Sequence, residues 1–201
     1  MKLVIAATGA SGTIYLQRLL EQIDCSAHEV HLVMSAHAKQ VAKQEVDLLK
    51  IPRGLVQHAE NDLNVPYVSG SARFDAMVIV PCSMATLGRI ASGASESALL
   101  RGADVFLKER RKLILVPRET PWNLIHARNV VTLLEAGAVV LPAALAADVP
   151  SHLGKAINLV LARPSASGLI RVRLTLTRTK VGRPCCSPLL PSGLSAIPDS
   201  A

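Results

Sequence analysis

The sequence predicts an α/β protein with a doubly wound, mostly parallel sheet in a flavodoxin-like or Rossmann-like three-layer sandwich. Five short apolar runs recur along the chain, and they are continuous rather than alternating, as in strands that are buried on both faces. Segments with helical spacing of apolar residues lie between most of them, as the crossover connections of parallel strands require. Glycine or polar residues directly follow several runs. In a parallel sheet, the carboxyl ends of the strands lie at the same edge, so these residues should lie near one another.

The first two runs each open a strand, turn and helix. Residues 2–8 lead into a Gly-rich turn at 9–12, after which apolar side chains recur at helical spacing up to Ile23. Residues 30–34 form the second strand, and Ser35 stands at its carboxyl end. The remaining expected elements, in chain order, are a helix over 36–49, a connection over 51–74, a strand over 76–80, helices over 85–91 and 97–107, a strand over 112–116, a helix over 123–136 and a strand over 138–141.

We expect one α/β domain over residues 1–162, closed by a helix at 152–162, and a basic, Pro-rich tail over 163–201. The tail has six basic side chains, one acidic side chain and five prolines, and it lacks a helical or strand period. Such composition favours poor order, and an added edge strand over 169–176 is the structural alternative.

Charge and cysteine content exclude several function classes. The net charge of +7 comes mostly from the tail, and aromatic side chains that could stack on bases are scarce, so no nucleic-acid partner is expected. No apolar run has the length that crosses a bilayer, so we expect no membrane association and a cytoplasmic location. The four cysteines contain no CxxC pair, which argues against a disulfide scaffold and a metal site.

Candidate binding residues lie at the ends of the predicted strands. The turn from Thr8 to Gly12 offers hydroxyls, flexible glycines and free N–H groups at a helix start, a combination that suits phosphate. Alone, the turn is as consistent with helix capping. Ser35 stands where a dinucleotide fold often carries a ribose-binding acid, so a mononucleotide fits better than NAD.

Two more clusters lie at the same predicted edge. Residues 81–86 place hydroxyls at a helix start, where Ser83 is read equally well as an N-cap or as a ligand contact. Arg118 and Glu119 stand between two prolines directly after a buried strand, a poor place for charges without a partner.

These segments resemble, in order and spacing, the UbiX/Pad family of flavin prenyltransferases. The resemblance covers about residues 1–144 and rests on T-G-A-S-G at 8–12, V-M-S at 33–35, P-C-S-M-A-T-L at 81–87, G-A-S-E-S-A-L-L-R-G-A-D-V-F-L-K-E-R-R at 93–111 and L-V-P-R-E-T-P-W at 115–122.

The resemblance implies an FMN-binding protein, usually a homododecamer, that joins a dimethylallyl group from dimethylallyl phosphate to N5 and C6 of reduced FMN. The product, prenylated FMN, serves partner decarboxylases of the UbiD type. Carried over by motif, the residues expected to contact FMN are Gly9, Ala10, Ser11, Ser35, Ser83, Met84, Ala85, Thr86 and Arg118.

The resemblance also implies a prenyl-phosphate site made of Lys108, Arg118 and Glu119, with Arg101 from a neighbouring subunit. Glu119 is expected to protonate the departing phosphate or relay a proton, Glu45 to complete the phosphate end, and Ser11 to assist proton movement near N5. Without the resemblance, the favoured interpretation of Glu119 is a structural ion pair with Arg118. The favoured interpretation of Glu45 is then a residue on a solvated helix face.

The sequence departs from the family after Ala144. The family continues with a Pro-x-Phe-Tyr segment whose Tyr contacts the prenyl phosphate, whereas this chain has no Tyr after Tyr67. An altered or out-of-frame ending is the favoured explanation. The alternative function is therefore an FMN-binding accessory protein or impaired homologue without prenyl transfer, and decarboxylation is a disfavoured third reading.

Overall fold

The computed structural model describes residues 1–143. Every described residue belongs to one compact unit. The helix expected over 152–162, the tail expected over 163–201 and the alternative strand over 169–176 lie outside the described residues.

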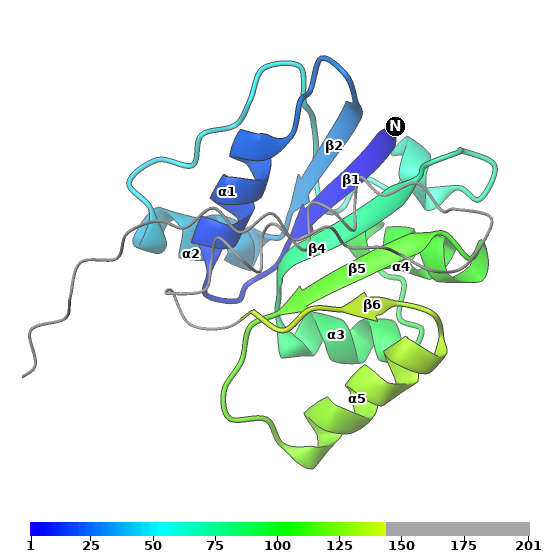
Figure 1. Ribbon diagram of the computed structural model, residues 1–201. Helices are drawn as coiled ribbons and strands as arrows, with labels where there is room; N and C mark the ends of the chain where they lie inside the picture. The colour runs from blue at the N-terminus through cyan, green and yellow to red at the C-terminus, as the bar shows by residue number, and fades with distance from the viewer. Residues whose placement is uncertain (144–201) are drawn as a thin grey trace, which may run out of the picture. The chain divides into compact units, whose positions relative to one another are not determined.

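The elements follow one another in the alternating order that the sequence predicts (Figure 1). Their bounds are β1 (Lys2–Ala7), α1 (Thr13–Gln22), β2 (Glu29–Met34), α2 (Ala36–Glu45), β3 (Val56–His58), the 3-10 helix η1 (Pro66–Val68), β4 (Ala76–Cys82), α3 (Met84–Ala91), α4 (Ala98–Lys108), β5 (Lys112–Pro117), α5 (Leu124–Glu135) and β6 (Val139–Val140).

The described strands form one sheet in the order β3-β2-β1-β4-β5-β6, and every pairing in it is parallel. Chain order runs outward from β1 in one direction and from β4 in the other, so the connections reverse between these two strands. Open α/β sheets bind ligands at such a switch point, beyond the carboxyl ends of the strands. The predicted fold class is confirmed.

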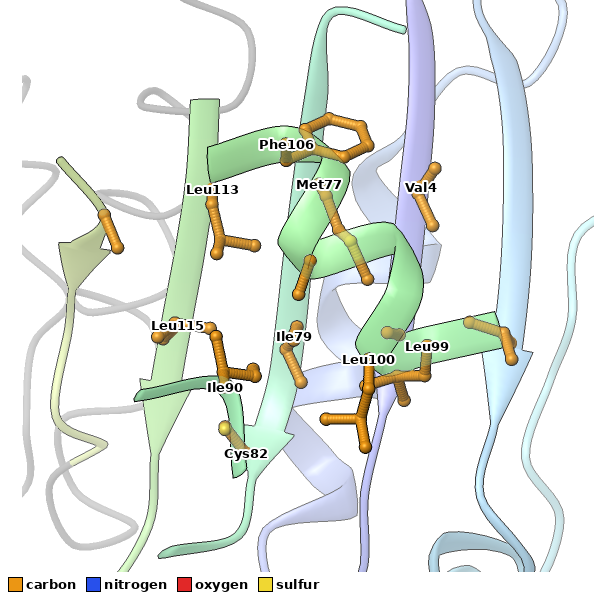
Figure 2. Packing of buried hydrophobic residues seen from close by; sticks show 14 of the residues in the cluster. Val4, Met77, Ile79, Cys82, Ile90, Leu99, Leu100, Phe106, Leu113 and Leu115 are labelled. Carbon is orange, nitrogen blue, oxygen red and sulfur yellow. The ribbon is translucent and has the colours of Figure 1, made fainter. Parts of the chain in front are cut away.

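Two apolar clusters cover the two faces of the sheet. One face, which includes Leu3 and Ile5 of β1, packs on α1 and α2. Figure 2 shows the other face, where Val4, Met77 and Leu113 meet side chains of α3 and α4. Because successive strand residues point to opposite faces, an apolar run without alternation fills both clusters.

Strand β3 is the main element that the sequence analysis missed, since residues 51–74 were expected to be only a connection. Its three residues lie at the sheet edge and are exposed or half-buried, so they carry no apolar run. His58 of β3 instead contacts His31 of β2 through a 2.7 Å hydrogen bond and a parallel ring stack. The expected helix over 36–49 is also shorter, ending at Glu45.

Within residues 1–143, no helix combines the length and apolar character needed to span a membrane.

Candidate functional site

The carboxyl ends of four adjacent strands are joined by hydrogen bonds just beyond the sheet. The N–H of Ser35 donates to Ala7 O at 3.0 Å, which joins β2 to β1. The Thr8 hydroxyl accepts from the N–H of Ser83 at 2.7 Å and donates to Pro81 O at 3.2 Å, which joins β1 to β4. The N–H of Arg118 donates to Cys82 O at 3.3 Å and joins β4 to β5. Three predicted clusters and Ser35 therefore meet at one edge.

The turn between β1 and α1 combines glycines with close packing. Gly12 has a φ of 108°, a left-handed conformation that glycine adopts without strain. A Cβ atom on Gly12 would stand 3.1 Å from the Tyr15 ring and 3.7 Å from Cγ of Arg118, while one on Gly9 would stand 2.6 Å from Cβ of His37. A side chain at Gly9 would clash with His37, and one at Gly12 would be tight against Tyr15 in a strained backbone conformation. Arg118 lies beside the turn.

Glu45 caps the start of α1 across 33 residues of chain. Its carboxylate accepts from the N–H of Gly12 at 2.8 and 3.0 Å and from the N–H of Thr13 at 2.7 Å. This position, at the positive end of the helix dipole, favours a negative charge. The structure therefore places Glu45 next to the Gly-rich turn, and the alternative of a purely solvated helix face does not describe its contacts.

Ser35 and Ser83 each cap a helix and also belong to the shared edge. Ser35 Oγ accepts from the N–H of Ala38 at 3.0 Å, and Ser83 Oγ accepts from the N–H of Thr86 at 3.2 Å. Among the described residues, no hydrogen bond is formed by the main-chain N–H groups of Met84 and Ala85 at the start of α3. Such N–H groups are available to an anion or a polar ring edge.

The loop from Arg118 to Asn123 follows β5 and is closed by short-range bonds. The N–H of Thr120 donates to Glu119 Oε1 at 3.1 Å, and the indole N–H of Trp122 donates to Glu119 O at 2.9 Å. No ion pair joins Arg118 to Glu119 in the described part of the chain. The alternative interpretation of this pair as a structural salt bridge is therefore not what the structure shows.

Arg101 and Lys108 both lie on α4, Arg101 in its first turn and Lys108 at its end. They are seven residues apart and exposed, so they share one helix face. Arg101 pairs with Asp104 at 3.2 Å, and Lys108 pairs with Glu109. Lys108 stands four residues before β5 begins, at the opposite edge of the sheet from Arg118. Within one chain, the structure does not bring Lys108 to the shared edge.

Cys82 lies at the end of β4 and is buried. Burial raises the pKa of its thiol to about 12, so the nucleophilic thiolate is scarce at neutral pH. Cys82 is therefore a packing residue of the second face (Figure 2).

Glu60 also organises this edge, although the sequence alone does not single it out. One Glu60 carboxylate oxygen accepts from the N–H of Ala36 at 3.1 Å, and its main-chain O accepts from the N–H of Ala98 at 2.9 Å. Glu60 thereby ties the start of α2 to the start of α4. Its place in a segment expected to be only a connection left no periodic signal that could have found it.

The residues at the shared edge suit a flavin mononucleotide. Three helices begin there, at Thr13, Ala36 and Met84. Contrary to expectation, the N–H groups of Gly12 and Thr13 are not free, because Glu45 accepts from both, and Glu60 accepts from that of Ala36. The N–H groups at the start of α3 and the hydroxyls of the edge are therefore the groups that suit a phosphate or the polar edge of a ring. The glycine turn allows close approach, and Arg118 adds a guanidinium whose five donors match phosphate or carbonyl oxygens.

Comparisons with known proteins agree with this geometry. Residues 1–160 match the Flavoprotein family. The flavin prenyltransferase UbiX of Methanocaldococcus jannaschii is 45% identical over 167 residues, which is 81% of this chain and 90% of that protein. The match to residue 160 extends past Ala144, where the sequence analysis placed the end of the resemblance.

Solved structures give the same result. A UbiX protein crystallised with FMN and dimethylallyl pyrophosphate is 39% identical, with a TM-score of 0.72 over 79% of this chain and 91% of that one. A dodecameric FMN-dependent UbiX-like decarboxylase from Escherichia coli O157:H7 is 34% identical, with a TM-score of 0.67 over 80% and 92% of the two chains.

Proposed function

Because the chain belongs to the Flavoprotein family and, within it, to the UbiX flavin prenyltransferases, we propose that it joins the dimethylallyl group of dimethylallyl phosphate to reduced FMN. The observation that carries this function is the hydrogen-bonded edge where Thr8, Ser35, Ser83 and Arg118 meet. Reduced FMN, when bound, supplies the electron-rich ring atoms that accept the prenyl group.

The shared edge supports a set of FMN contacts. Phosphate and ring oxygens of the flavin would be held by the hydroxyls of the edge and by the main-chain N–H groups of Met84 and Ala85 at the start of α3. Arg118 beside Gly12 would add the positive charge. The residues proposed to hold FMN are Gly9, Ala10, Ser11, Ser35, Ser83, Met84, Ala85, Thr86 and Arg118.

Cleavage of an allylic phosphate develops negative charge on the departing oxygens, so the site needs cations there. Arg118 supplies one from the same chain. Arg101 and Lys108 share one exposed face of α4, and we propose that both reach the prenyl phosphate of a neighbouring copy, since Lys108 lies at the far edge of its own sheet.

Three further residues are proposed to handle protons and position the groups. Glu119 follows Arg118 and is exposed, so its carboxyl can exchange a proton with the departing phosphate. Glu45 holds the N–H groups of Gly12 and Thr13 and so sets the turn beside Ser11, whose hydroxyl would assist proton movement at the flavin.

A contribution from a neighbouring copy requires an assembly, and we propose a homododecamer. The name of the E. coli relative describes it as dodecameric. Helix α5 of this chain exposes an apolar stripe made of Leu124, Val131 and Leu134, whose exposed fractions are 63%, 52% and 50%. Side chains of this kind are normally covered when they gather on one helix face.

The product would pass to a UbiD-type decarboxylase, and the protein would act in the cytoplasm. Cys25 and Cys82 are unpaired among the described residues, which fits a reducing compartment.

A coupled assay tests the proposed function. The protein is incubated anaerobically with reduced FMN and dimethylallyl phosphate, and the filtrate is added to a UbiD-type decarboxylase prepared without its cofactor. Decarboxylation that requires both the protein and the prenyl donor is the expected result. FMN binding with no activation would overturn prenyl transfer and favour the accessory-protein alternative.

A further inference from the structure

The loop between β5 and α5 carries Arg118 and Glu119, and its conformation depends on Trp122. The Trp122 indole N–H donates to the main-chain O of Glu119 at 2.9 Å and so closes the turn across three residues. At the other end, Asn123 and His126 form a capping box, with the N–H of His126 donating to Asn123 Oδ1 at 2.8 Å. Trp122 directly precedes this cap, and its indole N–H bonds back to Glu119.

Burial does not account for Trp122. Its side chain is 38% exposed and belongs to neither apolar cluster of the sheet. An indole N–H only donates, so it has one use in a hydrogen bond, and a ring with two rotatable bonds loses little freedom when it is held. The hydrogen bond to Glu119 O is therefore the interaction that an apolar side chain without a donor could not form at position 122.

We infer that Trp122 is a positioning residue for prenyl transfer. By holding the main chain of Glu119, it sets the direction in which Arg118 and Glu119 face the prenyl phosphate, without touching the substrate itself. This inference rests on the proposed function. A preformed loop binds its ligand without the cost of ordering, so the bond acts on substrate binding more than on the rate at saturation.

The first test uses the unaltered protein, because Trp122 is its single tryptophan. Fluorescence anisotropy decay of the ligand-free protein then reports this side chain alone. A pinned indole is expected to lose anisotropy with the tumbling of the whole particle. A dominant subnanosecond component would show a freely moving ring and overturn the inference, and neither result depends on prenyl transfer.

The second test compares Trp122→Phe with Ile125→Ala. Phenylalanine keeps an aromatic ring and removes the N–H donor, while Ile125 is a neighbouring apolar side chain that is 67% exposed. In Trp122→Phe, the KM for dimethylallyl phosphate is expected to rise about fivefold, the equivalent of one neutral hydrogen bond, with kcat within about twofold.

Ile125→Ala is expected to leave both constants within about twofold of the unaltered protein. An unchanged KM in Trp122→Phe, or an equal rise in Ile125→Ala, would overturn the positioning role and indicate a general contribution of exposed apolar surface. Absence of prenyl transfer in the unaltered protein would instead reject the proposed function, and the anisotropy decay would still decide whether the indole is held.

Discussion

At the scale of single residues, Gly12 is the point where backbone conformation and the candidate site coincide. It has a φ of 108°, its N–H donates to Glu45, and a Cβ atom there would approach both Tyr15 and Arg118. Gly137 offers a matched comparison, because its φ is 94° and nothing lies within 4 Å of the position of its Cβ.

We therefore predict that Gly12→Ala weakens FMN binding at least tenfold, whereas Gly137→Ala leaves it unchanged. Both substitutions force alanine into the left-handed region, which costs about 1–2 kcal/mol, so both should lower the midpoint of thermal unfolding. Only Gly12→Ala also disturbs the turn beside Arg118. Titration of the apoprotein with FMN measures the difference, and equal affinities in the two variants would contradict the role of Gly12.

The residues of the shared edge could largely be predicted from the sequence, and their contacts could not. Ser35, Ser83 and Arg118 each directly follow an apolar run, and parallel strands bring such positions together. Glu60 and Trp122 contribute through bonds that depend on the path of a loop, and no periodic pattern records that path. Lys108 was expected beside Arg118, but the ten residues of α4 before it carry it toward the opposite edge of the sheet.

At the scale of elements, β3 shows how a strand can be held without an apolar run. His58 of β3 meets His31 of β2, and His31 also contacts Glu29 at 3.1 Å. If His31 Nε2 donates to Glu29, then Nδ1 of neutral His31 accepts from His58. The rings of Tyr67 and Phe74 pack edge-on against His31, and Tyr67 also packs against His58. Side-chain contacts therefore fasten the edge strand.

His58 should make stability depend on pH. Burial lowers the pKa of His58, neighbouring His31 lowers it further, and Asp62 acts in the opposite direction. As the pH falls through about 6.5, the unfolded chain gains a proton at His58 before the folded chain does. The free energy of unfolding therefore decreases on acidification.

In a His58→Gln variant, an amide can still donate to His31 but does not titrate. We predict that the thermal midpoint falls less between pH 7.5 and pH 5.5 in this variant than in the unaltered protein. If the midpoint falls equally in His58→Gln and in the unaltered protein, His58 is not the group responsible.

At the scale of the whole molecule, the doubly wound parallel sheet could be predicted as a fold class, because the alternation of apolar runs and helices is regular. The assembly leaves a weaker trace in the sequence. Leu124, Val131 and Leu134 look like core positions of an amphipathic helix, yet the folded chain leaves all three exposed while Leu133 is buried. Only the fold shows which face of α5 is uncovered.

We predict that the double substitution Leu124→Glu with Val131→Glu reduces the molar mass in solution without unfolding the chain. Two charges on the stripe would remain hydrated in a monomer but would lose their water in an interface. Light scattering after size exclusion measures the mass, and Thr132→Glu, an exposed position beside the stripe, is the control. An unchanged mass in the double variant would place the interface elsewhere.

Transfer of a prenyl group to FMN changes the mass of the flavin. The purified protein is incubated without oxygen with reduced FMN and dimethylallyl phosphate, and the extracted flavin is analysed by mass spectrometry. We expect a gain of one dimethylallyl unit that disappears when Glu119→Gln replaces the unaltered protein. Flavin that binds but keeps its original mass would show that this chain is not a prenyltransferase.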